Sequence, residues 1–329
     1  MSNPSTATQA GIVVLIPVYN DWTSLHTLLR ELGAVSFAQG IELSVVVVDD
    51  GSSQPSPSDL LDGLPAGSLR GLEIVHLHLN LGHQSALAVG LSEIYRRHNP
   101  DLVIVMDADG EDRPQDIERL LTAHQRDPNA FVVAQRARRT EGYWFRVLYG
   151  LYRLLFRLFV GKGLDFGNFC LIPRALLGRI AFNPMSWNHL AAAISRSGIG
   201  IVRVRTDRGT RFHGRSSMSL PRLVSHGLSA VSVFLDVAMI RVLIFSTLLM
   251  SAAVLGVLTT LYLRLFTELA IPGWATSAVG LLSIIGLQGL ILSTIASFLV
   301  LRSRSGDQTV PAVDASKFVA GVERFLRDD

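Results

Sequence analysis

The chain has 329 residues, of which 49% are hydrophobic and only 17% are charged, with a formal net charge of +3 and an isoelectric point of about 9.3. Its single cysteine, Cys170, excludes an internal disulfide and a cysteine-based zinc site. The basic residues are almost all arginines, which favours phosphorylated or anionic-lipid partners; because no nucleic-acid-binding signature accompanies them, we expect no nucleic-acid partner.

The N-terminal half alternates predicted strands with predicted helices. Buried strands are expected at 11–16, 43–48, 72–77, 102–106 and 131–135. The segments between them carry apolar residues at helical spacing, and Pro114 opens one of these helices. This alternation predicts an α/β fold with a mostly parallel sheet and helices on both faces. The first ten residues lack a basic region, so we expect no signal peptide.

The strand expected at 102–106 runs directly into Asp107-Ala108-Asp109. Alternate side chains of an extended strand point the same way, so Asp107 and Asp109 offer two hard oxygen ligands to one divalent cation. Open α/β sheets bind ligands beyond the carboxyl ends of their strands. Taken alone, these residues are also compatible with a simple turn. Polar motifs at other strand ends favour the metal site; they are Pro17 to Asp21, Asp49 to Ser52 and Asn80 to His83.

The pattern changes after residue 139. Residues 143–160 are rich in aromatic and aliphatic side chains, and Arg146, Arg153 and Arg157 fall on one face of the helix expected there. Such a helix is typical of the membrane interface, with its arginines at the level of the lipid headgroups. A buried core helix is the alternative interpretation. Residues 219–237 predict a second amphipathic helix, next to the membrane.

Two apolar runs, 242–263 and 276–301, are each long enough at about 1.5 Å per residue to cross a hydrocarbon core of roughly 30 Å. We therefore expect two transmembrane helices within 241–302. Arginines flank their outer ends, so the positive-inside rule places both termini in the cytoplasm. The tail, 303–329, is expected to be a linker followed by a short docking helix, with Phe318, Val322 and Phe325 on one face.

The four motifs, in this order at successive strand ends, resemble those of the inverting GT-A glycosyltransferases of family 2, the group that includes dolichyl-phosphate mannose synthase. The two apolar runs that follow narrow the resemblance to the bacterial polyisoprenyl-phosphate glycosyltransferases. It implies a cytoplasmic GT-A domain, Rossmann-like in architecture, over 1–218. The implied activity is transfer of a sugar from a UDP- or GDP-linked donor to a polyprenyl phosphate, with undecaprenyl phosphate as the expected acceptor, at the bacterial inner membrane.

The resemblance also implies which residues bind the donor. The residues that would border or bind the nucleotide are Pro17, Tyr19, Asp21, Asp50 and Asp107. The ligands of a catalytic Mg²⁺ or Mn²⁺ would be Asp107, Asp109 and Glu111.

Catalytic and acceptor residues are implied in the same way. The catalytic group would comprise Asp109, Arg136 and Asp165, with Arg136 contacting phosphate. Residues expected to meet the acceptor phosphate or lipid headgroups are Arg211, Arg215 and Ser216 of a loop over the donor, together with Arg146, Arg153 and Arg157.

Three positions depart from the family pattern. Asn168 and Cys170 stand where many relatives have an acid and an arginine, and Ser217 stands where lysine is common. Asp165 lies nearby and is the candidate replacement carboxylate. A phosphate acceptor is already ionised at neutral pH and needs no general base. Asp165 would then orient groups or stabilise charge rather than remove a proton.

Two other functions stay open on the sequence alone. A lipid hydroxyl acceptor would make the protein a glycolipid synthase and would require a general base. A catalytically weak membrane scaffold for polysaccharide assembly is the third interpretation, although an intact metal site is not expected in a scaffold. The sequence also leaves a homo-oligomer open.

Overall fold

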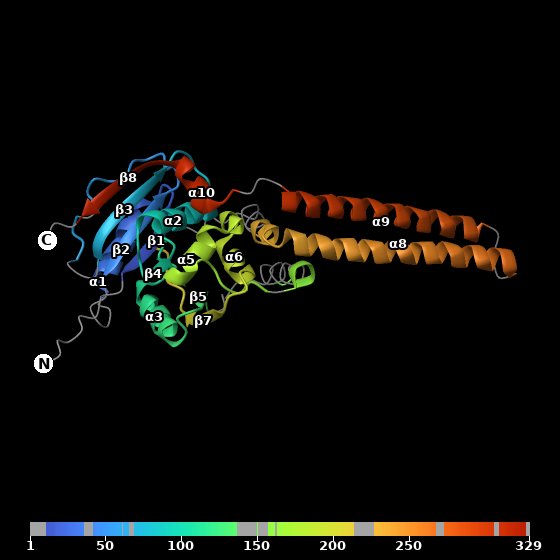
Figure 1. Cartoon of the computed structure of the whole chain (residues 1–329), viewed down its shortest axis with the longest axis horizontal. Coiled ribbons are helices and arrows are strands. Elements are labelled where there is room, and N and C mark those ends of the chain that lie inside the picture. The colour runs from blue at the N-terminus through green and yellow to red at the C-terminus, as the bar shows by residue number, and fades with distance from the viewer. Residues whose placement is uncertain are drawn as a thin grey trace. The chain divides into compact units, whose positions relative to one another are not determined.

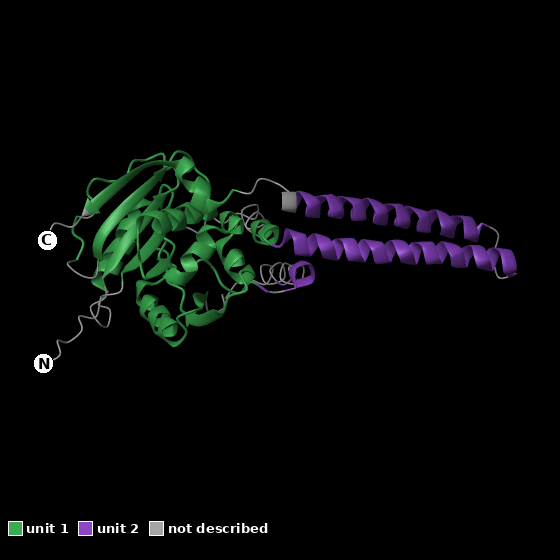
Figure 2. Cartoon of the chain, in the orientation of Figure 1, with its two compact units in different colours: residues 1–140, 164–233, 308–329 green, residues 141–163, 234–307 purple. Residues whose placement is uncertain are grey.

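A computed structural model describes residues 11–35, 42–60, 62–65, 69–136, 150, 157–161, 163–213, 227–267, 273–305 and 309–326. The chain divides into two compact units (Figure 2). Unit 1 comprises residues 1–140, 164–233 and 308–329, and unit 2 comprises 141–163 and 234–307. The strands belong to unit 1 and the two longest helices to unit 2 (Figure 1). The C-terminal segment therefore returns to the unit in which the chain begins.

Within the described residues, unit 1 contains an eight-stranded sheet of order β7-β5-β6-β4-β1-β2-β3-β8. Six of its strands run in one direction, and they are β1 (Ile12–Val18), β2 (Leu43–Asp49), β3 (Leu69–Leu77), β4 (Leu102–Val105), β5 (Phe131–Arg136) and β7 (Ile201–Thr206). Strands β6 (Cys170–Pro173) and β8 (Val319–Leu326) run antiparallel to their neighbours. The predicted α/β fold with a mostly parallel sheet is confirmed.

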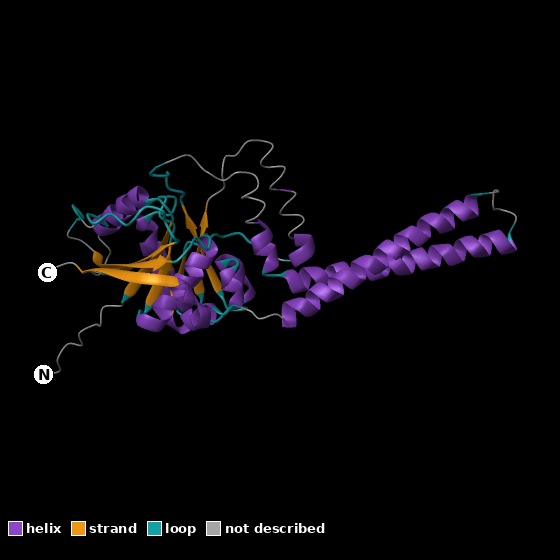
Figure 3. Cartoon of the chain, turned by 90° about the horizontal axis from the view of Figure 1, so that it is seen from above, coloured by secondary structure: helices purple, strands orange, loops and turns teal. Residues whose placement is uncertain are grey.

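Helices cover both faces of this sheet (Figure 3). On one face α1 (Trp22–Ala34) and α3 (Ile117–Arg126) share a hydrophobic cluster with Val14 of β1. On the other face α2 (His83–Arg97), α5 (Arg174–Ala181) and α6 (Leu190–Arg196) share a second cluster with Leu15. Because successive side chains of a strand point to opposite faces, β1 needs apolar residues throughout. Its continuous apolar run is the reason that the sequence predicts it.

Short turns of 3-10 helix complete unit 1 at Pro114–Asp116, Pro184–Trp187 and Ala315–Phe318. The last of them follows α10 (Pro311–Asp314) and leads directly into β8. The prediction of a docking helix in the tail was wrong, because residues 319–326 add a strand to the edge of β3, with Val322 opposite Val75. Unpaired N–H and C=O groups on an edge strand attract a further strand. That tertiary partner overrides the helical spacing of the apolar residues.

A buried carboxylate ties β8 to its neighbours. Glu73 of β3 is 6% exposed and accepts a hydrogen bond of 2.9 Å from Nε of Arg324 in β8. Its other oxygen lies 2.6 Å from Nη2 of Arg97 and 3.3 Å from Nε2 of His98. Burial by itself raises the pKa of Glu73, but the Arg324 hydrogen bond and the charges of Arg97 and His98 outweigh it and lower the pKa. The tail is thus held by charge as well as by backbone pairing.

Unit 2 contains two membrane-length helices, α8 (Leu235–Phe266) and α9 (Trp274–Ser305). Their mean hydropathies reach 2.3 and 2.2, and only 11% of the most apolar window of each helix is buried. Buried Ser246, Ala253 and Thr260 of α8 recur every seven residues, which is the spacing of a helix-packing seam. The hydroxyls of Ser246 and Ser293 lie 2.8 Å apart across it. Two apolar helices long enough to span a membrane are therefore confirmed within the described residues.

The two predicted amphipathic helices are described only in part. Of 143–160, residues 150 and 157–160 are helical, and of 219–237, residues 227–232 are helical before α8 begins at Leu235. The predicted acceptor residues that lie outside the described residues are Arg146, Arg153, Arg215 and Ser216. Arg157 is described and exposed, and its carbonyl oxygen accepts a hydrogen bond of 3.3 Å from Arg241 of α8.

Candidate active site

The loops after β1 and β2 are joined by hydrogen bonds at the carboxyl end of the sheet. Asn20 follows β1 with a left-handed φ of 53°, and its N–H donates to the Ser52 hydroxyl at 2.8 Å. Its side-chain oxygen accepts from the N–H of Ser53 at 2.9 Å. Asn tolerates this backbone region better than most residues. Two of the sequence motifs therefore form one surface.

The predicted nucleotide-binding residues of the first loop have different surroundings. Pro17 is buried within β1, whereas the Tyr19 side chain is 51% exposed. Asp21 is the N-cap of α1, where its carboxylate accepts from the N–H of Ser24 at 3.3 Å. The exposed ring of Tyr19 is therefore the group in this loop that is free to stack on a planar ligand.

Asp50 links the second and third motifs. Its carboxylate is buried and accepts hydrogen bonds from the backbone N–H groups of Leu81 and Gly82, at 2.7 and 3.0 Å. Burial raises the pKa of Asp50, and these two hydrogen bonds partly offset the rise. Both carboxylate oxygens thus hold the loop that leads into α2.

Gly51 is required by this close approach. Its φ is +68°, and a Cβ there would lie 2.5 Å from the carbonyl carbon of Leu79. We expect Gly51→Ala to lower the free energy of unfolding by about 3 kcal/mol, because left-handed strain and a backbone clash add together. Gly63 has a nearly identical φ of +69° with nothing within 4 Å of the added Cβ. Gly63→Ala should therefore cost only about 1 kcal/mol in thermal unfolding, and equal losses would contradict the assigned clash.

Asp107 follows β4 after one intervening residue, and one of its carboxylate oxygens has no hydrogen-bond partner. Its backbone N–H donates to Asp112 at 3.0 Å, which fixes the turn. The Oδ1 atom is buried and has no hydrogen-bond partner, and Nε2 of His83 lies 3.4 Å away. A buried carboxylate oxygen without a donor needs a compensating charge. This atom fits a divalent cation, for which carboxylate oxygen is a preferred ligand.

A chain of hydrogen bonds explains why His83 leaves that oxygen free. The N–H of Leu190 donates to Oε1 of Gln84 at 2.7 Å, so the amide nitrogen of Gln84 faces Asn168 and donates to Oδ1 at 3.2 Å. The amide nitrogen of Asn168 then lies 2.9 Å from Nε2 of His83, which must accept. A nitrogen that accepts cannot also donate to Asp107. An aspartate at 168 would lack this donor, which gives a physical reason for the asparagine.

Asp109 and Glu111 lie in the turn after Asp107 and share one arginine. Arg211 places Nη2 at 2.9 Å from Oδ2 of Asp109 and Nε at 2.8 Å from Oε1 of Glu111. Glu111 also pairs with Arg208. Burial raises the pKa of Asp109, and the charges of Asp107 and Glu111 act in the same direction, while the N–H of Glu111 and Arg211 oppose them. This acidic turn therefore attracts positive charge.

Two carboxylates are too few to complete the coordination of a divalent cation. In the part of the chain that the structure describes, no group of three or more His, Cys, Asp or Glu side chains is arranged to hold a metal ion. Mg²⁺ usually keeps several waters and binds through one or two carboxylates plus substrate phosphates. The pair Asp107 and Asp109 fits a cation of that kind, completed by ligands from outside the protein.

The other predicted catalytic residues lie on β5 and its flanks. Asp165 accepts from the side-chain amide of Gln135 at 2.8 Å and pairs with Nε of Arg203 of β7 at 3.1 Å. Arg136 ends β5 opposite Thr206, and its backbone alone is described. The structure thus brings Asp107 together with His83 and Asn168, and gives Asp165 an arginine partner.

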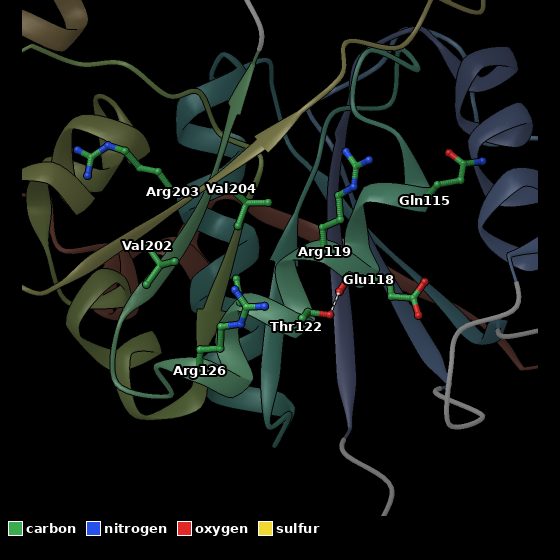
Figure 4. Close-up of a pocket in the computed structure, with 9 residues that line it drawn as sticks. Gln115, Glu118, Arg119, Thr122, Arg126, Val202, Arg203 and Val204 are labelled. Carbon is green, nitrogen blue, oxygen red and sulfur yellow. Dashed lines mark hydrogen bonds between the residues drawn. The ribbon is translucent and has the colours of Figure 1, made fainter.

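A groove of about 580 Å³ lies between α3 and β7 (Figure 4). Its lining includes Arg119, Arg126, Arg203 and the apolar side chains of Val202 and Val204. None of the four motifs contributes to it. The candidate active site is therefore defined by its chemistry at the strand ends rather than by the volume of a groove.

Comparison with known proteins shows the family of this chain. The undecaprenyl-phosphate 4-deoxy-4-formamido-L-arabinose transferase of Edwardsiella ictaluri (strain 93-146) is 28% identical over 280 residues, which cover 82% of this chain and 80% of the relative. Glucosyl-3-phosphoglycerate synthase from Mycobacterium tuberculosis, in complex with Mn²⁺, UDP-glucose and phosphoglyceric acid, gives a TM-score of 0.48 at 15% identity over 70% of this chain and 80% of that one. The same enzyme with Mg²⁺ and UDP gives 0.47 at 16% identity, over 70% and 79%. The family model of glycosyl transferase family 2 matches residues 13–181, just over half of the chain, and the protein belongs to that family.

Proposed function

We propose that this glycosyltransferase moves a sugar, with inversion, from a UDP- or GDP-linked donor to a polyprenyl phosphate, with undecaprenyl phosphate as the expected acceptor. The observation that carries the proposal is the buried, unpartnered Oδ1 of Asp107 beside Asp109, in a chain with two membrane-length apolar helices. The acceptor named for the Edwardsiella relative supports the lipid phosphate. A divalent cation held by these aspartates would neutralise charge on the leaving nucleoside diphosphate.

The chain's own residues have correspondingly simple tasks. A lipid phosphate is already a nucleophile at neutral pH, so no side chain has to take its proton. Tyr19 lies exposed beside the loops that would hold the nucleotide. Asp165 contacts Gln135 and Arg203, and its proposed role is to orient Arg203. Alignment of acceptor and donor then supplies much of the rate enhancement.

The proposed location is the cytoplasmic face of a bacterial inner membrane. Residues before α8 and after α9 belong to the same compact unit, with β8 paired to β3. If both helices span the bilayer, the two ends of the hairpin must lie on one side of it. Arginines near those ends, such as Arg241 and Arg302, favour the cytoplasmic side.

The activity is tested with the full chain purified in detergent. A panel of UDP- and GDP-sugars is offered with undecaprenyl phosphate, undecaprenol or diacylglycerol, and products are treated with mild acid. We expect turnover with the lipid phosphate alone and an acid-labile sugar phosphate ester. An acid-stable product formed only from a hydroxyl lipid would favour a glycolipid synthase. Absence of turnover with every donor would favour a scaffold.

The need for a general base is tested at Asp165. We expect Asp165→Asn to keep a tenth or more of the wild-type kcat with a phosphate acceptor, because the acceptor arrives ionised and the amide can still contact Arg203. The measurement is kcat under saturating donor, alongside Asp109→Ala. If the two variants lose activity equally while donor binding is unchanged, Asp165 is an essential carboxylate.

The arginines of the predicted interfacial helix are expected to serve the lipid acceptor. Each basic residue near an anionic surface contributes on the order of 1 kcal/mol. Replacing Arg146, Arg153 and Arg157 together by Gln should raise the KM for polyprenyl phosphate about tenfold or more and leave the KM for the nucleotide sugar nearly unchanged. High salt should reduce the difference. A matched triple variant changes exposed arginines of unit 1, namely Arg30, Arg126 and Arg179. Equal acceptor KM values in the two triple variants would refute the assignment.

A further inference from the structure

The segment that carries Arg211 lies directly across the acidic turn after β4. The N–H of Gly209 donates to the carbonyl oxygen of Glu111 at 2.9 Å, and the N–H of Phe212 donates to that of Asp109 at 3.0 Å. A Cβ on Gly209 would lie 2.0 Å from the carbonyl oxygen of Gly110, so only glycine permits this approach. The backbone therefore holds residues 209–212 in fixed register against the turn at residues 109–111.

The side chain of Arg211 uses that register to bridge two carboxylates. One edge of its guanidinium meets Asp109 at 2.9 Å, while Nε meets the 6%-exposed Glu111 at 2.8 Å. Glu111 is also paired with Arg208. Within the described residues, Asp109 forms an ion pair with Arg211, and Oδ1 of Asp107 has no hydrogen-bond partner. A guanidinium thus contacts Oδ2 of Asp109, a carboxylate oxygen of one of the two proposed cation ligands.

We propose that the guanidinium of Arg211 neutralises Asp109 when no metal or donor is bound. Binding of a metal–nucleotide complex then breaks the ion pair between Arg211 and Asp109, and the cation replaces the guanidinium. This inference rests on the proposed function. Glu111 keeps Arg211 in place during this change, because the contact of Glu111 with Nε of Arg211 remains when the contact between Nη2 of Arg211 and Asp109 is broken. The released N–H groups then face a phosphate held on the same cation, and Arg with phosphate forms strong, directional hydrogen bonds. Arg211 is thus a positioning residue that couples the two ligands.

The coupling has a measurable thermodynamic consequence. Free metal must displace Arg211 without offering it a new partner, so it should bind weakly. A nucleoside diphosphate supplies that partner, so metal and nucleotide should strengthen each other's binding. Such coupling is reciprocal and typically amounts to 5- to 150-fold in affinity.

The test measures Mn²⁺ binding by electron paramagnetic resonance, using the full chain in detergent with and without UDP or GDP. In the wild type we expect the nucleotide to tighten Mn²⁺ binding at least about fivefold. In Arg211→Gln, Mn²⁺ alone should bind at least about fivefold more tightly than in the wild type, and the nucleotide effect should fall below about twofold.

Arg208→Gln is the matched control. Arg208 lies three residues away, carries the same charge and pairs with Glu111, but not with Asp109 in any contact that the structure describes. If Arg211 acts by occupying the site, Arg208→Gln should change Mn²⁺ binding less than about twofold. An equal gain in both variants would mean a general field effect and would overturn the proposal, as would weaker Mn²⁺ binding in Arg211→Gln.

A thermal melt checks that each variant is folded. Arg211→Lys keeps the charge but cannot bridge two carboxylates with a planar fork, so it should also reduce the nucleotide effect and serves if Arg211→Gln does not fold. An undiminished nucleotide effect in Arg211→Lys would count against the proposal. Because these readouts need no turnover, they are independent of the acceptor assay: the coupling can fail while glycosyl transfer is observed, and the reverse.

Discussion

Asp109→Ala is expected to reduce nucleotide-sugar turnover at least about a hundredfold while the protein stays folded and in the membrane. Asp109 lies in the turn that follows β4, two residues after the predicted ligand Asp107, and its loss would remove both charge and geometry from the proposed cation site. EDTA should have the same effect on the wild type, with Mg²⁺ or Mn²⁺ restoring the rate. The measurement is donor consumption with undecaprenyl phosphate as acceptor.

The matched control for this variant is Asp59→Ala, which removes an exposed carboxylate in the connection between β2 and β3. It should leave turnover within about twofold of the wild type, as is usual for exposed positions away from special features. In Asp109→Ala, added metal should give no recovery. Full activity of the wild type in EDTA would contradict the prediction that turnover needs a divalent cation.

Ending the chain at residue 308 should have the largest effect on stability. The truncation removes β8 from β3, takes Arg324 from the buried Glu73, and separates Trp187 from Phe318, whose rings lie 5.3 Å apart. A buried acid that loses one of its charged partners and an open sheet edge are both costly, although Arg97 and His98 still contact Glu73. We expect the melting temperature to fall by about 10 °C or more.

The control truncation removes only residues 327–329, beyond β8, and should shift the melting temperature by less than about 2 °C. Both proteins are melted in the same detergent, and the fraction recovered from membranes is compared. If the protein ending at residue 308 has the same melting temperature as the wild type, β8 does not contribute to the stability of the sheet.

The sequence predicts those strands whose own residues form a recognisable apolar pattern. Strands β1, β2 and β4 are buried on both faces, so their continuous valine, isoleucine and leucine runs identify them. By contrast, β6 has only four residues, and β7 alternates apolar with basic side chains at the edge of the sheet. β8 forms only because β3 offers a partner more than two hundred residues away in sequence. Spacing within the tail carries no information about that partner.

The candidate site divides in the same way. Asp107 and Asp109 are identified by their position after a strand, which is a local pattern. The contacts of His83 with Asn168 and of Glu111 with Arg211 join residues 85 and 100 positions apart. Composition and periodicity do not specify such pairs, and the Asn80 to His83 motif was the one local signal for His83. A departure such as Asn168 becomes interpretable only when its neighbours are known.

The return of the C-terminal strand also sets the order in which a newly made chain can mature. Strands β1 to β7 of the described chain leave the ribosome before the two apolar helices, but the edge of β3 stays open until Val319–Leu326 has been synthesised. At 5–20 residues per second, the 242 residues from Leu77 to Val319 take roughly 10–50 s. Both apolar helices are translated within that interval, before the last strand of unit 1 exists. Completion of the sheet can therefore follow only after both apolar helices have been synthesised.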